Sequence, residues 1–165
     1  MSWLKIISAT AIITFIFGIA TIDCAVAGEK QKIKFHGAIF NGKFEPIKVG
    51  DEEGHVLAIY TAKQIYFDDL TDGKMHSTGV NFMDINTKTG RGFVQGYGST
   101  IYKDGDKTFR THKGQPAGKG HWKGTWEFVK GTGKYEGIKG GGTWNSYSLG
   151  HDQSYLEVEG ESEIP

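Results

Sequence analysis

The sequence is poor in cysteine and proline, and it carries no excess of charge of either sign. It has one cysteine and three prolines among 165 residues, and its 19 basic and 19 acidic residues give a formal net charge of zero. A neutral chain without a basic run has no field that attracts a polyanion, so we expect no nucleic-acid partner. With so little cysteine, stability must come from hydrophobic burial and strand pairing and not from disulfides.

The motifs of common cofactors are also missing, so we predict neither a cofactor nor a metal. Lys134 lies where a phosphate-binding loop has its lysine, but Phe128 replaces the first glycine of that motif and Tyr135 replaces its serine or threonine. The six histidines are scattered and not clustered at ligand spacing. His112 and His121 could still approach each other across the loop between them, which leaves a metal site as an alternative.

The one long apolar run lies at the start of the chain. Lys5 precedes the run at residues 6–20, and a small-x-small cleavage site follows at residues 25–27. This is the pattern of a secretory signal peptide, so we predict a leader over residues 1–27 and one domain over residues 28–165. The expected location is therefore secreted or periplasmic.

Two alternatives to a cleaved leader remain open. A retained membrane anchor would need a longer apolar run, since a helix spans a bilayer with about 20 residues. Lipid attachment at Cys24 would be unfavourable because Asp23 precedes it, where such sites have a small neutral residue. Cleavage would remove one basic and one acidic residue, so the mature domain stays neutral. It would also remove the cysteine and the apolar run, so we expect neither a thiol nucleophile nor a membrane contact in the mature domain.

The rest of the chain alternates strand-like runs with glycine-containing turns, and no apolar stretch has helical spacing over a useful length. We predict eight strands, at residues 32–40, 55–67, 76–87, 92–103, 107–113, 119–130, 135–148 and 153–161. Closing such a sheet removes its two unpaired edges. The predicted fold class is therefore all-β, a single antiparallel eight-stranded barrel.

The run at residues 119–130 shows which side of a strand must be covered. Trp122, Trp126 and Phe128 share one face with Gly124, while charged residues occupy the opposite face. Glycine beside tryptophan suits a strongly coiled strand, because the missing Cβ leaves room for a large ring. A barrel of eight strands encloses either packed side chains or one small ligand.

Residues 131–140, Gly-Thr-Gly-Lys-Tyr-Glu-Gly-Ile-Lys-Gly, resemble the glycine-rich hairpin of allene oxide cyclases and plant dirigent proteins. That hairpin has the pattern Gly-Ser/Thr-Gly-x-aromatic, followed by a glycine five residues later. The Gly-Thr-Trp triplets at residues 124–126 and 142–144 also resemble uncharacterised exported bacterial proteins of this barrel type. The resemblance implies a calycin-like barrel, commonly oligomeric, with a hydrophobic cavity used for cyclisation or for orienting a bound intermediate. The catalytic polar residues of the cyclases and the acidic pocket residues of the dirigent proteins have no partner that aligns here.

Candidate pocket residues are those that share a strand face with large apolar side chains. Asp84 has the parity of Val80 and Phe82, and Glu136 has the parity of Trp144, so either carboxylate could be a catalytic acid or base. Each could equally lie near a strand end where water reaches it. The predicted walls of the ligand pocket are aromatic: Tyr60, Tyr66, Tyr97, Trp122, Trp126 and Trp144.

These observations favour a binding function. We expect an exported barrel that holds a small apolar or aromatic molecule in its interior without transforming it. One alternative is a cofactor-free isomerase or cyclase of the allene oxide cyclase-like type, in which a carboxylate or histidine moves a proton. A second alternative is a structural barrel with a filled interior that acts through its outer face or as a homo-oligomer.

Overall fold

The computed structural model describes residues 30–67, 75–150 and 152–165, and the predicted leader with Cys24 lies outside this part of the chain. Within it the chain forms strands and one short 3-10 helix, η1 (Gly133–Tyr135), and no helix there has the length and apolarity to cross a membrane. The strands are β1 (Lys30–Asn41), β2 (Ile47–Lys48), β3 (His55–Phe67), β4 (Met75–Asn86), β5 (Arg91–Ile101), β6 (Lys107–Gly118), β7 (His121–Gly131), β8 (Lys139–Gly150) and β9 (Gln153–Glu163).

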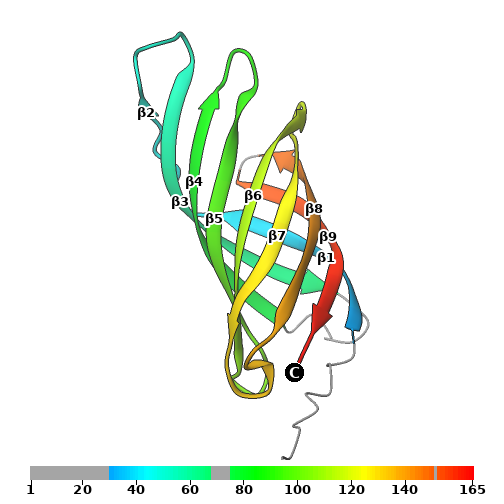
Figure 1. The fold of residues 1–165 in the computed structure, drawn as a ribbon. Coiled ribbons are helices and arrows are strands. Elements are labelled where there is room, and N and C mark those ends of the chain that lie inside the picture. Colours follow the sequence, from blue (N-terminus) through cyan, green and yellow to red (C-terminus); the bar gives the residue numbers. More distant parts are fainter. Residues whose placement is uncertain (1–29, 68–74, 151) are drawn as a thin grey trace, which may run out of the picture.

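The eight long strands form one antiparallel sheet that closes on itself, as Figure 1 shows. Their order is β1-β9-β8-β7-β6-β5-β4-β3, and β3 pairs in turn with β1. The all-β, eight-stranded antiparallel barrel predicted from the sequence is confirmed. Closure pairs the two strands that would otherwise be exposed edges, which protects the sheet from pairing with another chain.

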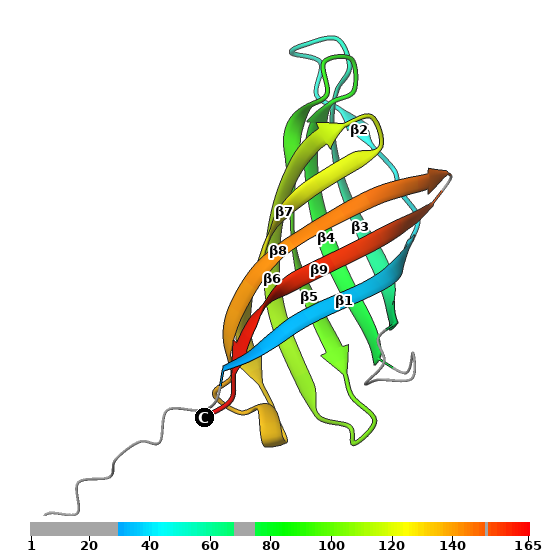
Figure 2. The same cartoon turned by 90° about the vertical axis from the view of Figure 1, so that its right-hand side faces the viewer.

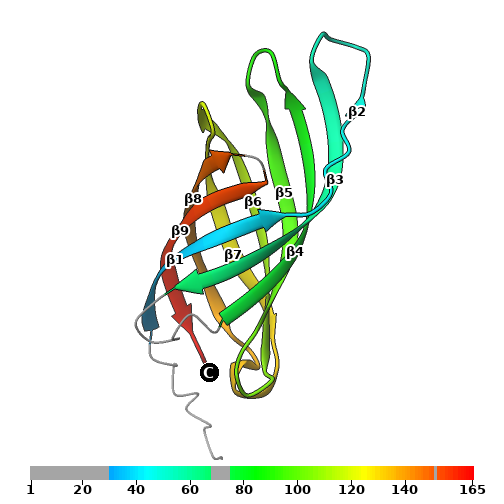
Figure 3. The same ribbon diagram turned by 180° about the vertical axis from the view of Figure 1, so that it is seen from behind.

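Among the described residues, the seam between β1 and β3 joins the second half of β1 to the second half of β3. It runs from His36 opposite Phe67 to Asn41 opposite Ala62. Beyond it the first half of β3 pairs with β4 on one side and briefly with β2 on the other. The strands β3, β4 and β5 therefore rise above the rest of the wall, while β1, β9 and β8 cross obliquely below them (Figures 2 and 3).

The strand boundaries follow the sequence prediction closely, with two differences at turns. β6 continues through Pro116 to Gly118, where a loop was predicted, because a register shift between Pro116 and Gly118 accommodates the missing N–H. Residues 135–138 were predicted as strand, but Tyr135 ends η1 and residues 136–138 form the turn that follows it. The short strand β2 was not predicted at all, since two residues carry no periodicity.

Inward-facing glycines make room for large rings. A Cβ added at Gly114 would lie 2.6 Å from Cη2 of Trp144, and one added at Gly124 would lie 2.7 Å from Cε2 of the same indole. Both approaches are much shorter than a van der Waals contact, so Trp144 occupies the space that two missing side chains leave. This is the pairing of glycine with tryptophan that the sequence suggested for coiled strands.

Candidate binding cavity

The barrel encloses a cavity of about 350 Å³ lined by side chains from all eight long strands. Its mouth is formed by Phe44, Gly120, Trp122 and Asp152, which lie beside the β6–β7 and β8–β9 turns and the segment after β1. At the other end, Phe35, Tyr66, Met75 and Tyr102 pack together and form the floor of the cavity. Thr108, one of the most buried residues of the described part, also belongs to the floor.

Aromatic rings form much of the cavity wall. The indole Nε1–H groups of Trp126 and Trp144 donate to the backbone carbonyls of Glu159 and Thr125, at 3.3 and 3.2 Å. With their polar edges satisfied in the wall, the rings add apolar surface to the cavity. Burial raises the pKa of the Tyr60 phenol to about 12, so this ring stays neutral at physiological pH.

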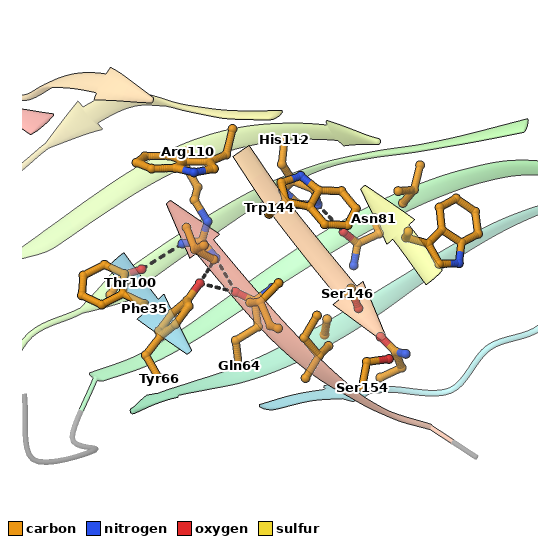
Figure 4. Close-up of a pocket in the computed structure, with 18 of the residues that line it drawn as sticks. Phe35, Gln64, Tyr66, Asn81, Thr100, Arg110, His112, Trp144, Ser146 and Ser154 are labelled. Carbon is orange, nitrogen blue, oxygen red and sulfur yellow. Dashed lines mark hydrogen bonds between the residues drawn. The ribbon is translucent and has the colours of Figure 1, made fainter. Parts of the chain in front are cut away.

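The deep half of the cavity holds an arginine in a network of neutral acceptors (Figure 4). Arg110 donates from Nη1 to the Thr100 hydroxyl at 2.9 Å, and from Nη2 to the hydroxyls of Tyr66 and Ser77, both at 2.9 Å. Nη2 also contacts the side-chain oxygen of Gln64, which accepts a second hydrogen bond from the Tyr66 hydroxyl at 2.6 Å. Three neighbouring strands besides β6 thus hold one guanidinium in place.

A histidine lies two residues further along β6, toward the mouth. Nε2 of His112 is 2.8 Å from Oδ1 of Asn81, and because a carbonyl oxygen can only accept, Nε2 carries the proton. Burial, together with the nearby charge of Arg110, lowers the pKa of His112 to about 4. The imidazole is therefore neutral at physiological pH, with Nδ1 available as an acceptor.

Five of the six aromatic residues predicted as pocket walls line this cavity, namely Tyr60, Tyr66, Trp122, Trp126 and Trp144. Tyr97 does not: it is 47% exposed on the outer face of β5, with its ring tilted over Phe109 at 6.1 Å. The sequence did not show which side of β5 faces inward, and the structure places Val94 and Thr100 on the inner side. Tyr97 therefore has no access to a ligand held inside the barrel.

The two carboxylates predicted as catalytic also lie outside the cavity. Asp84 shares its face with Val80, as expected, but that is the outer face, where Val80 is 55% exposed. Glu136 is exposed in the turn between η1 and β8. The parity argument failed for Asp84 because β4 carries apolar side chains on both faces, so apolar neighbours do not identify the inner one.

Asp84 instead belongs to a cluster on the outer wall. Its Oδ1 is 3.0 Å from Nε2 of His55, whose Nδ1 is 2.6 Å from Oδ1 of Asp51. The hydrogen bond to Asp51, followed by the one to Asp84, raises the pKa of His55, while the hydrogen bond from His55 lowers the pKa of Asp51. This cluster ties the loop before β3 to β4.

The two histidines considered for a metal site lie on opposite sides of the wall. His112 points into the cavity, whereas His121 stacks on Tyr147 at 4.5 Å and contacts the Asn145 side chain. In the described ranges, no group of three or more His, Cys, Asp or Glu side chains is arranged to hold a metal ion. The polar cavity residues that the sequence did not point to are Gln64, Asn81 and Arg110. They come together with His112, which the sequence suggested only as a metal ligand, across the barrel.

The fold and the cavity define a class: a closed antiparallel barrel with a ligand-sized, aromatic-lined interior. No protein-family model matches the sequence, and no curated protein matches it. Among solved structures, the pterocarpan synthase dirigent proteins GePTS1 and PsPTS1 are similar, each with a TM-score of 0.55. GePTS1 is 9% identical over 84% of this chain and 93% of its own, and PsPTS1 is 10% identical over 84% and 97%.

A protein of unknown function from the DUF3224 family of Shewanella oneidensis MR-1 is equally similar in fold. Its TM-score is 0.55, with 16% identity over 83% of this chain and 99% of its own. Identities this low establish a shared fold and no more. The protein shares its barrel fold with these dirigent proteins, in agreement with the resemblance of the glycine-rich hairpin.

Proposed function

We propose that this protein is an exported barrel that binds a small apolar or aromatic molecule in its interior. The observation that carries the proposal is the cavity of about 350 Å³, which reaches the surface at its mouth and is walled by indole and phenol rings. Ligand pockets have volumes of roughly 300–1,000 Å³ and combine apolar walls with a few placed polar groups. A barrel with a purely structural role would have this volume filled by side chains.

The shared fold also supports a small-molecule role. Two proteins of this fold are pterocarpan synthase dirigent proteins, so a barrel of this shape can serve a reaction of small molecules. Export is part of the proposal because residues 1–27 have the pattern of a cleavable leader. The ligand would then be met outside the cytoplasm.

Binding without catalysis is the better supported of the two ligand hypotheses. A cofactor-free isomerase needs a group in the cavity that exchanges a proton near physiological pH. Asp84 and Glu136 lie outside the cavity, and the pKa of His112 is lowered to about 4. Among the described residues, Asp152 is the acidic residue that lines the cavity, and it lies at the mouth in the turn before β9.

The test introduces a large side chain into the cavity and, as a control, introduces the same side chain on the outer face of the same strand. Ser146 and Thr143 lie on β8, with Ser146 lining the cavity and Thr143 exposed. We expect the wild-type protein to bind the neutral fluorescent probe N-phenyl-1-naphthylamine, and Ser146→Phe to weaken binding by about tenfold or more because the new ring occupies the site. Thr143→Phe should bind like the wild type.

Native mass spectrometry of protein purified from its own host provides an independent readout, since a bound molecule adds its mass to the barrel. A wild-type protein that binds no probe and carries no added mass would contradict the proposal. Equal probe binding by Ser146→Phe and the wild type would place the binding site elsewhere on the molecule.

A further inference from the structure

We propose that the molecule held in the cavity is an organic anion whose carboxylate pairs with Arg110 at the deep end of the barrel. The inference rests on the proposed binding function and names the chemical class of its ligand. The head group would lie beside Arg110, and the apolar body would extend toward the mouth past Trp144 and Trp126.

The position of Arg110 is the first argument. β6 runs from the floor of the cavity to its mouth, and Arg110 lies in the first half of this strand with its side chain in the cavity (Figure 4). Hydrogen bonds to Gln64, Ser77 and Thr100 hold the guanidinium from β3, β4 and β5. A group fixed in this way is preorganised, because little side-chain freedom remains to be lost when a ligand binds.

The charge of Arg110 is the second argument. Within residues 30–67, 75–150 and 152–165, no carboxylate lies within 4 Å of the guanidinium, and every hydrogen-bond acceptor recorded for it is neutral. Withdrawing a cation from bulk water is costly unless an anion compensates it. A neutral side chain could link the same strands without that cost. A carboxylate from the ligand would complete the pair and would accept charge-assisted hydrogen bonds from the guanidinium.

Free donors on the guanidinium are the third argument. Nη2 contacts three acceptors, and Nη1 donates one hydrogen bond. In the described part of the chain, the Nε hydrogen and the second Nη1 hydrogen have no acceptor. These two donors lie on different edges of the guanidinium, and each could donate one charge-assisted hydrogen bond to a carboxylate oxygen. The nearby polar groups His112 and Asn81 are neutral and share one hydrogen bond, so among the described lining residues Arg110 supplies the positive charge.

The shape of the cavity sets where the rest of the molecule lies. From Arg110 toward the mouth, the wall presents His112 and Trp144 and then Ser146 and Ser154 (Figure 4). The ring of His112 meets the indole of Trp144 edge-on, with centroids 6.4 Å apart. An aromatic or aliphatic body fits between the indoles, with its acid group directed to the floor.

Two fluorescent probes of nearly the same shape separate the charge of the ligand from its apolar body. The probe 8-anilino-1-naphthalenesulfonate carries an oxyanion, and N-phenyl-1-naphthylamine lacks it. We expect the wild-type protein to bind the anionic probe at least about tenfold more tightly, as a charge-assisted hydrogen-bonded pair would provide. Decanoate should also displace the neutral probe at least about tenfold better than methyl decanoate does, which tests a carboxylate on the unmodified protein.

Arg110→Met keeps the length of the side chain and removes its charge, and it should abolish the preference, so that this variant binds the two probes with equal affinity. The matched control is Arg91→Met, because Arg91 is the other arginine of the sequence and is exposed at the start of β5. Arg110→Lys should retain part of the preference, and it serves if the methionine variant does not fold.

The outcomes distinguish this inference from the binding function on which it rests. Equal wild-type affinities for both probes, together with equal displacement by decanoate and its ester, would overturn the anionic ligand and leave cavity binding intact. An anion preference that survives in Arg110→Met would assign the charge recognition to another group. Failure of the wild type to bind either probe would overturn both proposals.

Discussion

At the residue scale, His112 and His55 show how the two sides of one barrel wall shift a pKa in opposite directions. His112 lies in the cavity, where burial followed by the charge of Arg110 lowers its pKa to about 4. His55 lies on the outer wall, where the hydrogen bonds that it donates to Asp51 and Asp84 raise its pKa above 6.5. The inner histidine therefore resists protonation, and the outer one favours it.

His112 should make the protein less stable as the pH falls from 6.5 to 4. In this range the unfolded chain binds a proton at this imidazole and the folded chain does not, so the free energy of unfolding decreases by up to about 1 kcal/mol per pH unit. Urea unfolding of the wild type and His112→Gln across this range measures the effect as the difference between the two slopes.

His121→Gln is the matched control, because His121 lies on the outer face of the next strand. Parallel pH profiles for the wild type and His112→Gln would show that the imidazole titrates normally in the folded barrel. His55 adds a contribution of the opposite sign, which is complete below pH 6.5 and is lost as the pH rises through its raised pKa; it is common to all three proteins and cancels in the comparison.

At the element scale, the β7–β8 turn explains its glycine-rich sequence. Gly133 has φ of +55°, a conformation that other residues adopt at a cost, and a Cβ there would collide with the carboxylate of Asp106. That carboxylate accepts a hydrogen bond from the Lys134 N–H at 3.1 Å, and Oγ1 of Thr132 accepts one from the Lys107 N–H at 2.9 Å. The turn is thus joined to the neighbouring β5–β6 turn by side-chain contacts.

Gly133→Ala should therefore destabilise the protein more than Gly105→Ala. Both glycines have positive φ, at +55° and +89°, but Gly105 has no neighbouring atom within 4 Å of an added Cβ. We expect about 1–2 kcal/mol from the left-handed conformation at either site, and about 1–3 kcal/mol more at Gly133 where the hydrogen bond to Asp106 is lost. Chemical denaturation of the two variants gives the comparison, and equal losses would mean that Asp106 can move away freely.

At the scale of the whole molecule, the barrel closes through the shortest ladder between long strands in the described ranges. There β1 pairs with β9 from Lys30 opposite Glu163 to Phe40 opposite Gln153, and with β3 from His36 opposite Phe67 to Asn41 opposite Ala62. A shorter ladder has fewer hydrogen bonds to break, so local opening should require less free energy there. The wall beside this seam includes Ile39 and Ala62, which line the cavity.

We expect amide hydrogens that cross the β1–β3 seam to exchange with solvent faster than those of the β1–β9 and β4–β5 ladders. Hydrogen exchange followed by NMR would resolve the three sets, and the protection of the seam should rise when the cavity is occupied. Uniform protection of all three ladders would show that the barrel opens only by global unfolding.

The outer wall carries several exposed apolar side chains, including Ile59, Val80 and Tyr97 at 70%, 55% and 47% exposure. Apolar patches on a protein surface often mark an interaction site. The homo-oligomer that the sequence suggested stays a prediction, and the mass of the protein in sedimentation velocity would measure it.

The sequence alone determined the fold class and most strand positions, because a period of two and glycine turns are local signals. It also placed Trp122 and Trp126 inward correctly, since only one face of β7 is apolar. Tertiary structure decided the inner faces of β4 and β5, where Asp84 and Tyr97 lie outside, because both faces of these strands carry apolar residues. It also decided that Arg110 meets Gln64, since the register of distant strands in a closed barrel brings them together.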